Sequence, residues 1–338
     1  MHLKEKQKLW QCSVCFPLFV TFITFGSAAL SSAETMEKRQ LTFTTVMYPT
    51  DWSVKNTLLL VESIRNFAGS LSQAPIWCFM PQYGKHVSTQ IENRLRELNV
   101  EFISFSVDLE ILRFFFAGDI IAAARAESTA TGKTELLVWL GSNTIVLNDP
   151  GAFLLCANKK LGYRPVHHIN IGSVYDNELD PFWKIIYQYC QVPEDRLFPM
   201  DTHIDAKTIR PYFNAGFLVV RPEEKLFKNW QDLFFEVYQQ PQFQDLYKQD
   251  ERYVIFLHQA ILSGIILAKY KLEELEELPH TYNYPIHLFS EDVTAHRPSR
   301  LEELVAVRHE GFYQDPAWME KMPAGEPLKK WLAEKLPK

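Results

Sequence analysis

Apolar residues in the first half of the chain follow two alternating periods. Some short runs are β-rich with continuous or alternating apolar side chains, and these predict strands. The longer segments between them carry apolar residues three or four positions apart, and these predict helices. The expected strands are 41–48, 76–80, 100–105 and 136–140. The expected helices are 54–67, 87–98 and 116–127. This order of elements predicts an α/β fold with a mostly parallel central sheet and helices on both faces.

The pattern is less regular after residue 147, although several elements are still expected. They are a helix at 182–189, a strand at 217–220 and helices at 226–238 and 253–267. The sequence has no internal repeat and no Gly/Ser-rich linker. We therefore expect residues 34–338 to form a single domain, with its ligand at the carboxyl ends of the parallel strands.

The first 33 residues differ from the rest of the chain. Lys4, Lys6 and Lys8 precede the uncharged stretch 9–33, which ends in small residues. This layout is typical of a signal peptide cleaved after Ala33 and predicts export or entry into a secretory pathway. The alternative is an uncleaved single-pass anchor, since the stretch is long enough to cross a hydrocarbon core of about 30 Å. We expect membrane contact only through this segment.

Composition places the remainder among globular domains. The chain is 47% hydrophobic and 22% charged, with a net charge of −6. It has no cluster of basic residues, so we expect no nucleic-acid partner. Cys78, Cys156 and Cys190 lie beyond the first 33 residues; three cysteines do not make a disulfide framework, and Cys78 in an apolar strand is expected to be a buried free thiol.

Several familiar catalytic motifs are absent or incomplete. The GKT sequence at 132–134 lacks the first glycine of a phosphate-binding loop and precedes a strand rather than a helix. The HEGFY sequence at 309–313 lacks the second histidine of a zinc-protease helix. Neither G-x-S-x-G nor G-x-G-x-x-G occurs, which argues against the common hydrolase elbow and dinucleotide site.

The most informative segment is LLVWLGSNTIVLNDP at 136–150, in which a three-residue polar break separates two apolar runs. This layout resembles the metal-binding turn of GT-A glycosyltransferases, the fold of nucleotide-diphospho-sugar transferases. In that family the break reads Asp-x-Asp, because two carboxylates hold Mn²⁺ or Mg²⁺ against the diphosphate of the sugar donor.

Other segments are similar to the same family in the same order. They are VESIRNF at 61–67, APIW at 74–77, YFNAGFLVVRP at 212–222 and HQA at 258–260. The resemblance covers residues 41–265. It implies a single GT-A-like, Rossmann-like domain that binds a nucleotide sugar and transfers the sugar to an acceptor that the sequence does not identify.

The resemblance and the strand positions together suggest the binding residues. Tyr48 and Asp51 follow the carboxyl end of the first strand, where the nucleotide pocket of this fold begins. The other expected contacts are in the polar break, in the FNAG segment and in the HQA segment, namely Ser142, Asn143, Asn214, Gly216 and Gln259. The resemblance also makes His309 a candidate to complete the shell of a bound metal; the alternative, and the more frequent case, is an ordinary surface or core histidine. No catalytic residue is assigned.

The chain departs from the family at its charged positions. The break reads Gly141-Ser142-Asn143, so both carboxylates are missing and metal-dependent chemistry is in doubt. Asp119 stands where the family has a basic residue, and His258 where it favours Asp. A metal-free donor site needs other positive groups, and the sequence offers Arg125, Lys133 and Arg221 as candidates.

Two classes of function therefore stay open. The first is a glycosyltransferase that binds a nucleotide sugar without a strongly bound metal. The second is a non-catalytic exported binding or scaffold protein that retains the transferase fold. A retained anchor favours the enzyme, and a cleaved signal with free secretion favours the scaffold. An exported hydrolase has less support, because no pair of carboxylates stands out in the sequence.

Overall fold

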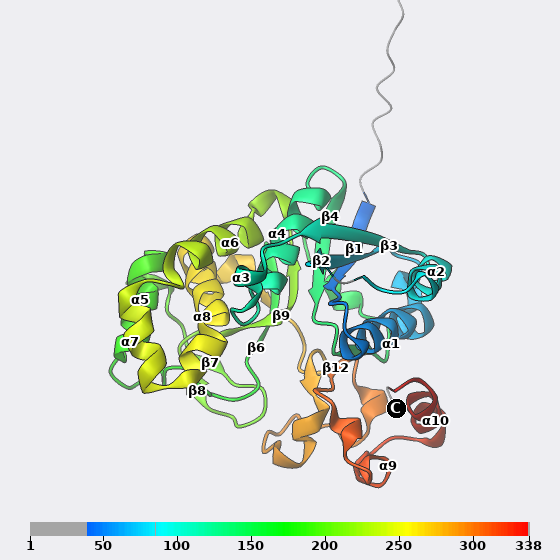
Figure 1. Ribbon diagram of the computed structural model, residues 1–338. Helices are drawn as coiled ribbons and strands as arrows, with labels where there is room; N and C mark the ends of the chain where they lie inside the picture. The colour runs from blue at the N-terminus through cyan, green and yellow to red at the C-terminus, as the bar shows by residue number, and fades with distance from the viewer. Residues whose placement is uncertain (1–38, 85, 337–338) are drawn as a thin grey trace, which may run out of the picture. The chain divides into compact units, whose positions relative to one another are not determined.

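A seven-stranded sheet forms the centre of the domain in the computed structural model, which describes residues 39–84 and 86–336 (Figure 1). In spatial order its strands are β10 (Leu275–Glu277), β6 (Leu161–Pro165), β9 (Phe213–Val220), β4 (Thr134–Leu140), β1 (Arg39–Val46), β2 (Ile76–Gln82) and β3 (Val100–Ser106). Only β9 runs against its neighbours, β4 and β6. The other pairs are parallel, which confirms the mostly parallel sheet expected from the sequence.

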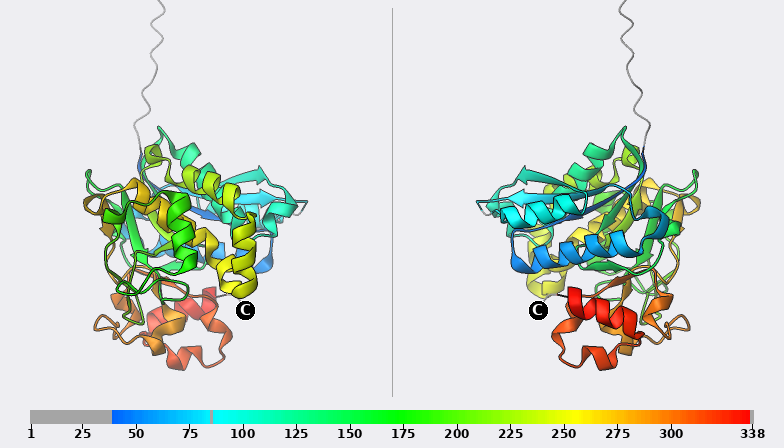
Figure 2. Two further views of the ribbon diagram at one scale, coloured as in Figure 1. Left: turned by 90° about the vertical axis from the view of Figure 1, so that its left-hand side faces the viewer. Right: turned by 90° about the vertical axis from the view of Figure 1, so that its right-hand side faces the viewer.

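Helices cover both faces of this sheet, as the two side views show (Figure 2). The helices of the described residues are α1 (Asp51–Phe67), α2 (Thr89–Glu97), α3 (Leu109–Leu112), α4 (Ala117–Ala130), α5 (Pro181–Cys190), α6 (Leu226–Val237), α7 (Pro241–Gln249), α8 (Glu251–Lys269), α9 (Trp318–Lys321) and α10 (Glu326–Lys335). Of these, α9 and α10 lie away from the central sheet, in the C-terminal part (Figure 1). The described residues form one compact unit.

Alternation along β4 explains the two layers. Leu137 and Trp139 join the hydrophobic cluster formed with α4, α5, α6 and α8. Leu136, Val138 and Leu140 join the cluster formed with α1 and α2. Because successive side chains point to opposite faces of a strand, an uninterrupted apolar run such as β4 must be covered on both sides.

A small second sheet brings the C-terminal part of the chain against the turn after β4. Its strands are β11 (Tyr284–Pro285), β12 (Ala306–Arg308) and β5 (Thr144–Val146). The antiparallel pairing of β12 with β5 places Arg308 opposite Thr144, and the N–H of His309 donates to the carbonyl of Asn143 at 3.0 Å. The polar break is therefore flanked by residues that lie far away in the sequence.

Most of the expected elements are present, with shifted ends. The helix expected at 226–238 is α6, and the strand expected at 217–220 is longer, because β9 begins at Phe213. The two small sheets, including β7 (Met200–Asp201) and β8 (Thr208–Ile209), were not predicted, because strands of two or three residues carry too little periodicity. Cys78 is a buried free thiol, as expected.

Two membrane-related observations concern different parts of the chain. The predicted signal peptide or anchor, residues 1–33, lies outside the residues that the structure describes. Within the described part, α8 is long and apolar enough to span a bilayer, but 61% of its apolar window is buried inside the domain. It packs against β9, α5 and α6, which is the environment of a core helix.

A buried carboxylate ties α4 to α6. The α6 N-cap residue, Lys225, makes no side-chain capping bond. Instead Glu127 of α4 accepts the N–H groups of Phe227 and Lys228 at 3.0 and 2.9 Å. These are donors that a helix leaves unpaired in its first turn. Burial raises the pKa of Glu127 to about 7, although the backbone N–H groups lower it.

We expect Glu127→Ala to lower the free energy of unfolding by about 2–4 kcal/mol, because it leaves one buried and one partly buried N–H group without an acceptor. Glu127→Gln should cost less, since its amide oxygen still accepts one of them. Denaturant unfolding measures both, with the exposed neighbour Ser128→Ala as control. A Glu127→Ala variant as stable as the control would contradict this capping role.

Candidate functional site

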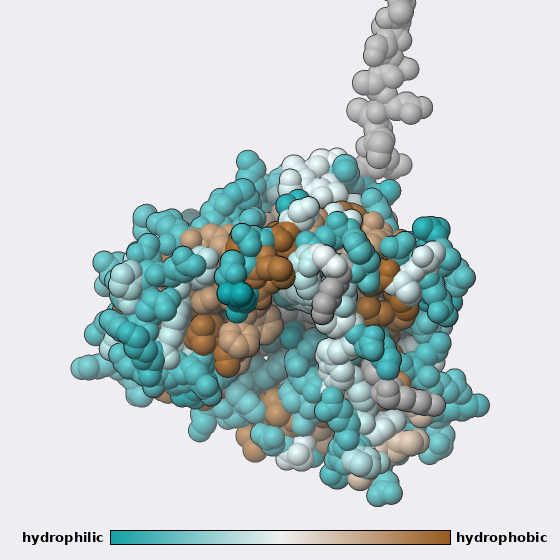
Figure 3. All heavy atoms as spheres, in the orientation of Figure 1, coloured by the Kyte–Doolittle hydropathy of each residue, from teal (hydrophilic) through white to brown (hydrophobic). Residues whose placement is uncertain are grey.

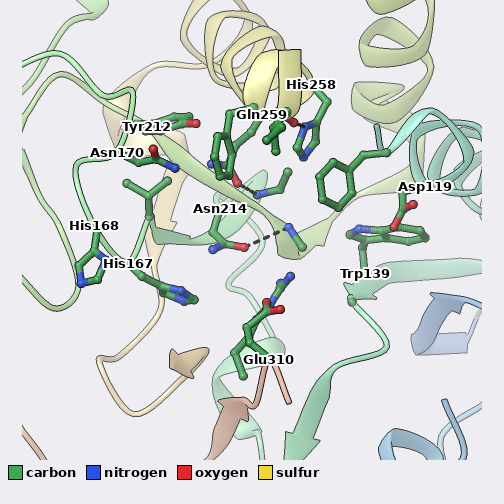
Figure 4. Close-up of a pocket in the computed structure, with 18 of the residues that line it drawn as sticks. Asp119, Trp139, His167, His168, Asn170, Tyr212, Asn214, His258, Gln259 and Glu310 are labelled. Carbon is green, nitrogen blue, oxygen red and sulfur yellow. Dashed lines mark hydrogen bonds and ion pairs between the residues drawn. The ribbon is translucent and has the colours of Figure 1, made fainter. Parts of the chain in front are cut away.

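A cavity of about 560 Å³ lies at the carboxyl end of β4. We call it the β4 cavity. Its wall comes from the start of α4, from β9 and α8, from the segment after β6, and from the segment around β12 (Figure 4). From β1 the chain continues outward on one side of the sheet, through β2 and β3, and then returns to the other side of β1 with β4. The cavity thus adjoins the point where the strand order reverses, which is where open α/β sheets bind ligands.

Arg308 is the only Arg or Lys among the described residues that line the β4 cavity. Its Nε donates to Oε1 of Glu310 at 2.9 Å. The same carboxylate oxygen accepts from Nδ2 of Asn143 at 2.7 Å. The Nη1 group of Arg308 is buried and has no hydrogen-bond partner. An unpaired buried cationic donor is costly, so a position of this kind suits an anionic ligand.

Two glycines leave room for this guanidinium. A Cβ on Gly216 would overlap Nη1 of Arg308, and a Cβ on Gly141 would lie 3.3 Å from the same atom. Gly141 is the first residue of the polar break after β4, and Gly216 lies in the FNAG segment of β9. Both glycines therefore serve the placement of one arginine.

The charge of Glu310 is set by its neighbour. Burial alone would raise the pKa of Glu310, but the charge and the hydrogen bond of Arg308 outweigh burial and lower the pKa to about 2. The carboxylate is therefore ionised at neutral pH. It neutralises much of the Arg308 charge while no ligand is bound.

Buried polar groups hold the β9 side of the wall. Oε1 of Gln259 accepts the N–H of Ala215 at 2.9 Å, and Oδ1 of Asn214 accepts the N–H of Gly216 at 3.1 Å. Both side chains are at least nine-tenths buried. These bonds satisfy backbone donors where β9 passes the cavity, so the wall is fixed rather than a free loop. In the close-up, Asn214 lies above Glu310, and His167 and His168 lie to the left of both (Figure 4).

A second carboxyl group lies at the start of α4. Oδ2 of Asp119 accepts the hydroxyl of Tyr48 at 2.5 Å. Burial raises the pKa of Asp119 to about 6, although the Tyr48 hydrogen bond and the charge of Arg308 lower it. At neutral pH this group adds a second negative charge to a wall that has one cation.

Two buried histidines of the wall, His167 and His258, are neutral. Burial lowers the pKa of His258 to about 3, and burial lowers the pKa of His167 well below its ordinary value. His258 stacks on Phe116 with ring centroids 4.2 Å apart, and its Nδ1 donates to the carbonyl of Ile255 at 2.9 Å. These rings shape the cavity without adding positive charge.

Comparison with known protein families identifies the domain. Residues 45–268 match the Rhodobacterales glycosyltransferase domain family. The chain belongs to this family. The match includes β4 and its polar break, β9 with its FNAG segment, and nearly all of α8. No curated protein matches the sequence.

The chain is also similar to solved glycosyltransferases at low sequence identity. LgtC is 12% identical, with 87% of this chain and 100% of that chain covered and a TM-score of 0.49. WbbM, a bifunctional glycosyltransferase, is 15% identical over 88% of this chain, with a TM-score of 0.48. The match spans only 51% of the WbbM chain. Mouse xyloside xylosyltransferase 1 is 10% identical, with 81% and 98% of the two chains covered and a TM-score of 0.43.

The residues at the turn of this glycosyltransferase domain do not fit a divalent metal. Mg²⁺ and Mn²⁺ prefer several oxygen ligands, mostly carboxylates. The part of the chain that the structure describes holds no group of three His, Cys, Asp or Glu side chains that could share an ion. The Asn143 amide is bonded to Glu310, and that carboxylate is bonded to Arg308.

His309, the predicted metal ligand, does not line the β4 cavity. It is fully buried on the other side of β12, where its ring lies 5.5 Å from that of Tyr313. Its Nδ1 accepts the N–H of Gly311 at 3.2 Å, and burial lowers its pKa to about 4. It has no carboxylate partners with which to hold a metal at the turn.

The other predicted residues fall into two groups. Asn214, Gly216 and Gln259 line the β4 cavity. Asn143 lies beside the β4 cavity and donates a hydrogen bond to Glu310 of its wall. Tyr48 donates a hydrogen bond to Asp119, which also belongs to the wall.

Ser142 and Asp51 differ from this group. Ser142 is partly buried in the turn but is not part of the cavity wall. Asp51 is exposed at the start of α1 and lines a separate hollow with His86 and Val87. The β4 cavity thus does not include Asp51.

Sequence reasoning missed Arg308 and Glu310, because β12 has only three residues and ends at Arg308, which is too short a strand to show a period. The basic residues proposed instead lie elsewhere. Arg125 lies over the ring of Phe105, with 5.0 Å between its guanidinium carbon and the ring centroid. Lys133 precedes β4 at the opposite end of the strand, and Arg221 binds carbonyls of the 155–159 segment.

Asp119 should make stability depend on pH. Its folded pKa of about 6 lies above the ordinary value of about 3.9, so its stabilising contribution is complete below pH 4 and is lost as the pH rises through 6. We expect Asp119→Asn to gain stability relative to the wild type across this interval, by on the order of 1–3 kcal/mol.

Urea unfolding of both proteins at pH 4, 5, 6 and 7 measures the difference. Tyr48→Phe is the companion variant, because removing the hydroxyl takes away a bond that lowers the Asp119 pKa. Tyr48→Phe should therefore shift the pH range over which the stabilising contribution of Asp119 is lost to higher pH. A difference between wild type and Asp119→Asn that is the same at all four pH values would show that the carboxyl is not perturbed.

Proposed function

We propose that this glycosyltransferase-family protein binds a nucleotide-activated sugar in the β4 cavity and transfers the sugar to an acceptor hydroxyl. In this reaction the bond between the anomeric carbon and the diphosphate oxygen breaks, and a bond to the acceptor oxygen forms. The products are the glycoside, the nucleoside diphosphate and the proton of the hydroxyl.

The observation that carries this proposal is the cation at the carboxyl end of β4. Arg308 has a buried Nη1 without a partner, and it lies where the strand order of the sheet reverses. A diphosphate leaving group gains negative charge as the sugar departs, and a fixed cation stabilises that charge. The cavity volume of about 560 Å³ is within the ordinary range for small-molecule sites.

The sugar would lie deeper in the cavity, against β9 and α8. Asn214 and Gln259 offer amide groups there, and Phe116 and Trp139 offer ring faces or edges. Amides and aromatic rings are suited to the hydroxyls and the apolar faces of a sugar.

The alternative is a non-catalytic binding or scaffold protein with the same fold. One observation favours it: Glu310 and Asp119 give the wall two carboxyl groups against one cation, which opposes a dianionic ligand. The two functions differ in one measurable property, because a scaffold of this kind needs no donor affinity.

We also propose that residues 1–33 direct the chain into an export pathway or anchor it to a membrane. This proposal rests on the three lysines and the uncharged stretch after them. Mass spectrometry of the purified native protein distinguishes the two forms: a mature N-terminus at Glu34 indicates cleavage, and an intact leader indicates an anchor.

Donor binding is the direct test. We would titrate the purified full-length protein with a panel of nucleotide sugars and nucleoside diphosphates by calorimetry, with Mn²⁺ and with EDTA. We expect saturable binding of at least one nucleotide sugar. If none binds at millimolar concentration in either buffer, the transferase proposal is wrong and the scaffold remains.

A substitution in the wall locates the bound donor. Asn214→Asp keeps the acceptor for the N–H of Gly216 but adds a negative charge, so donor affinity should fall roughly tenfold. The control is Asn229→Asp, which makes the same change at an exposed position of α6. Equal affinities for the two variants would place the donor outside the β4 cavity.

A further inference from the structure

An arginine lies against the polar break after β4. Four features belong to one arrangement: Gly141 and Gly216 leave the space, Arg308 fills it, and the Asn143–Glu310 pair holds Nε of the arginine. A Cβ at Gly216 would overlap the guanidinium, and one carboxylate oxygen of Glu310 accepts from both Asn143 and Arg308.

The geometry also separates the two ends of the guanidinium. Nε is bound to Glu310 at 2.9 Å, whereas Nη1 is buried between Gly141 and Gly216 without a partner. A structural ion pair would use the forked face of the arginine, since bidentate contact with a carboxylate is the stronger arrangement. Here the carboxylate takes the Nε position and leaves Nη1 without an acceptor.

We propose that Arg308 binds the diphosphate of the donor in place of a divalent cation, with Asn143 and Glu310 as its positioning residues. This inference rests on the proposed function, and it makes donor binding independent of metal. It also assigns a purpose to the missing carboxylates: two acidic side chains at the break would bind the guanidinium themselves and compete with the diphosphate.

Substitutions of Arg308 and of Glu310 should then have opposite effects on the affinity for the diphosphate. Removing the guanidinium removes the cation that holds the phosphates. Removing only the charge of Glu310 leaves an amide oxygen that still accepts from Nε and from Asn143, and it ends the competition for the cation. A merely structural ion pair predicts the contrary, because breaking it from either side would harm the site.

The experiment measures affinity for uridine diphosphate and guanosine diphosphate by calorimetry of the full-length protein, in EDTA and again with Mn²⁺. We expect Arg308→Gln to weaken binding roughly ten- to hundredfold, as loss of a charge-assisted phosphate contact does. We expect Glu310→Gln to strengthen it, by roughly three- to tenfold. Replacing EDTA by Mn²⁺ should change wild-type affinity less than twofold.

Two further variants guard against a folding artefact. The double variant Arg308→Gln/Glu310→Gln removes both charges of the Arg308–Glu310 pair together, and it should bind as weakly as Arg308→Gln alone. Arg113→Gln removes an exposed arginine that pairs with Glu110, and it should bind as the wild type does. Thermal unfolding of each variant shows whether its fold is intact.

The outcomes separate this inference from the proposed function. Wild-type binding that requires Mn²⁺, or that survives Arg308→Gln, overturns the role of Arg308 and leaves the transferase proposal standing. Weakened binding in Glu310→Gln, equal to that in Arg308→Gln, makes the pair structural and also overturns it. If neither these diphosphates nor any nucleotide sugar binds, both proposals fall together.

Discussion

The pairing of β12 with β5 is the constraint on which the site depends. It is a short antiparallel ladder, yet it brings residues 306–308 to the turn after β4 and faces Arg308 toward β9. Without it, Gly141 and Gly216 would border an empty space, and Asn143 would have no carboxylate to bind. The hydrophobic cluster beneath this small sheet, which includes Ile145, Val307 and Leu332, holds the ladder in place.

The electrostatics of the wall follow from that placement. One cation faces two carboxyl groups, and burial keeps His167 and His258 neutral. The carboxyl groups offset the charge of Arg308, which lowers the cost of burying a guanidinium. It also means that the affinity for an anion depends on small changes in the charge of Glu310 and Asp119. The surface around the cavity is uneven: hydrophobic side chains gather around α3, next to a recessed hydrophilic area (Figure 3).

The order and type of the main elements could be predicted from the sequence, because β1 to β4 and the helices between them have strong periods. The family could also be inferred, since its segments occur in order along one stretch of chain. The arginine could not be found this way. Glu310 bonds to Asn143 across 167 positions of sequence, and β12 has only three residues, so neither local period nor motif spacing marks the contact. His309 was chosen because it resembled a known ligand, and its neighbours on both sides face the cavity instead.

The crystal structure of the full-length protein with a nucleoside diphosphate, grown in the presence of Mn²⁺ and measured at the manganese absorption edge, would test this account most directly. We predict phosphate oxygens at hydrogen-bond distance from the guanidinium of Arg308, roughly 2.7–2.9 Å, and no anomalous peak at the turn after β4. A manganese peak between Asn143 and the diphosphate, with Arg308 turned away from the phosphates, would contradict it.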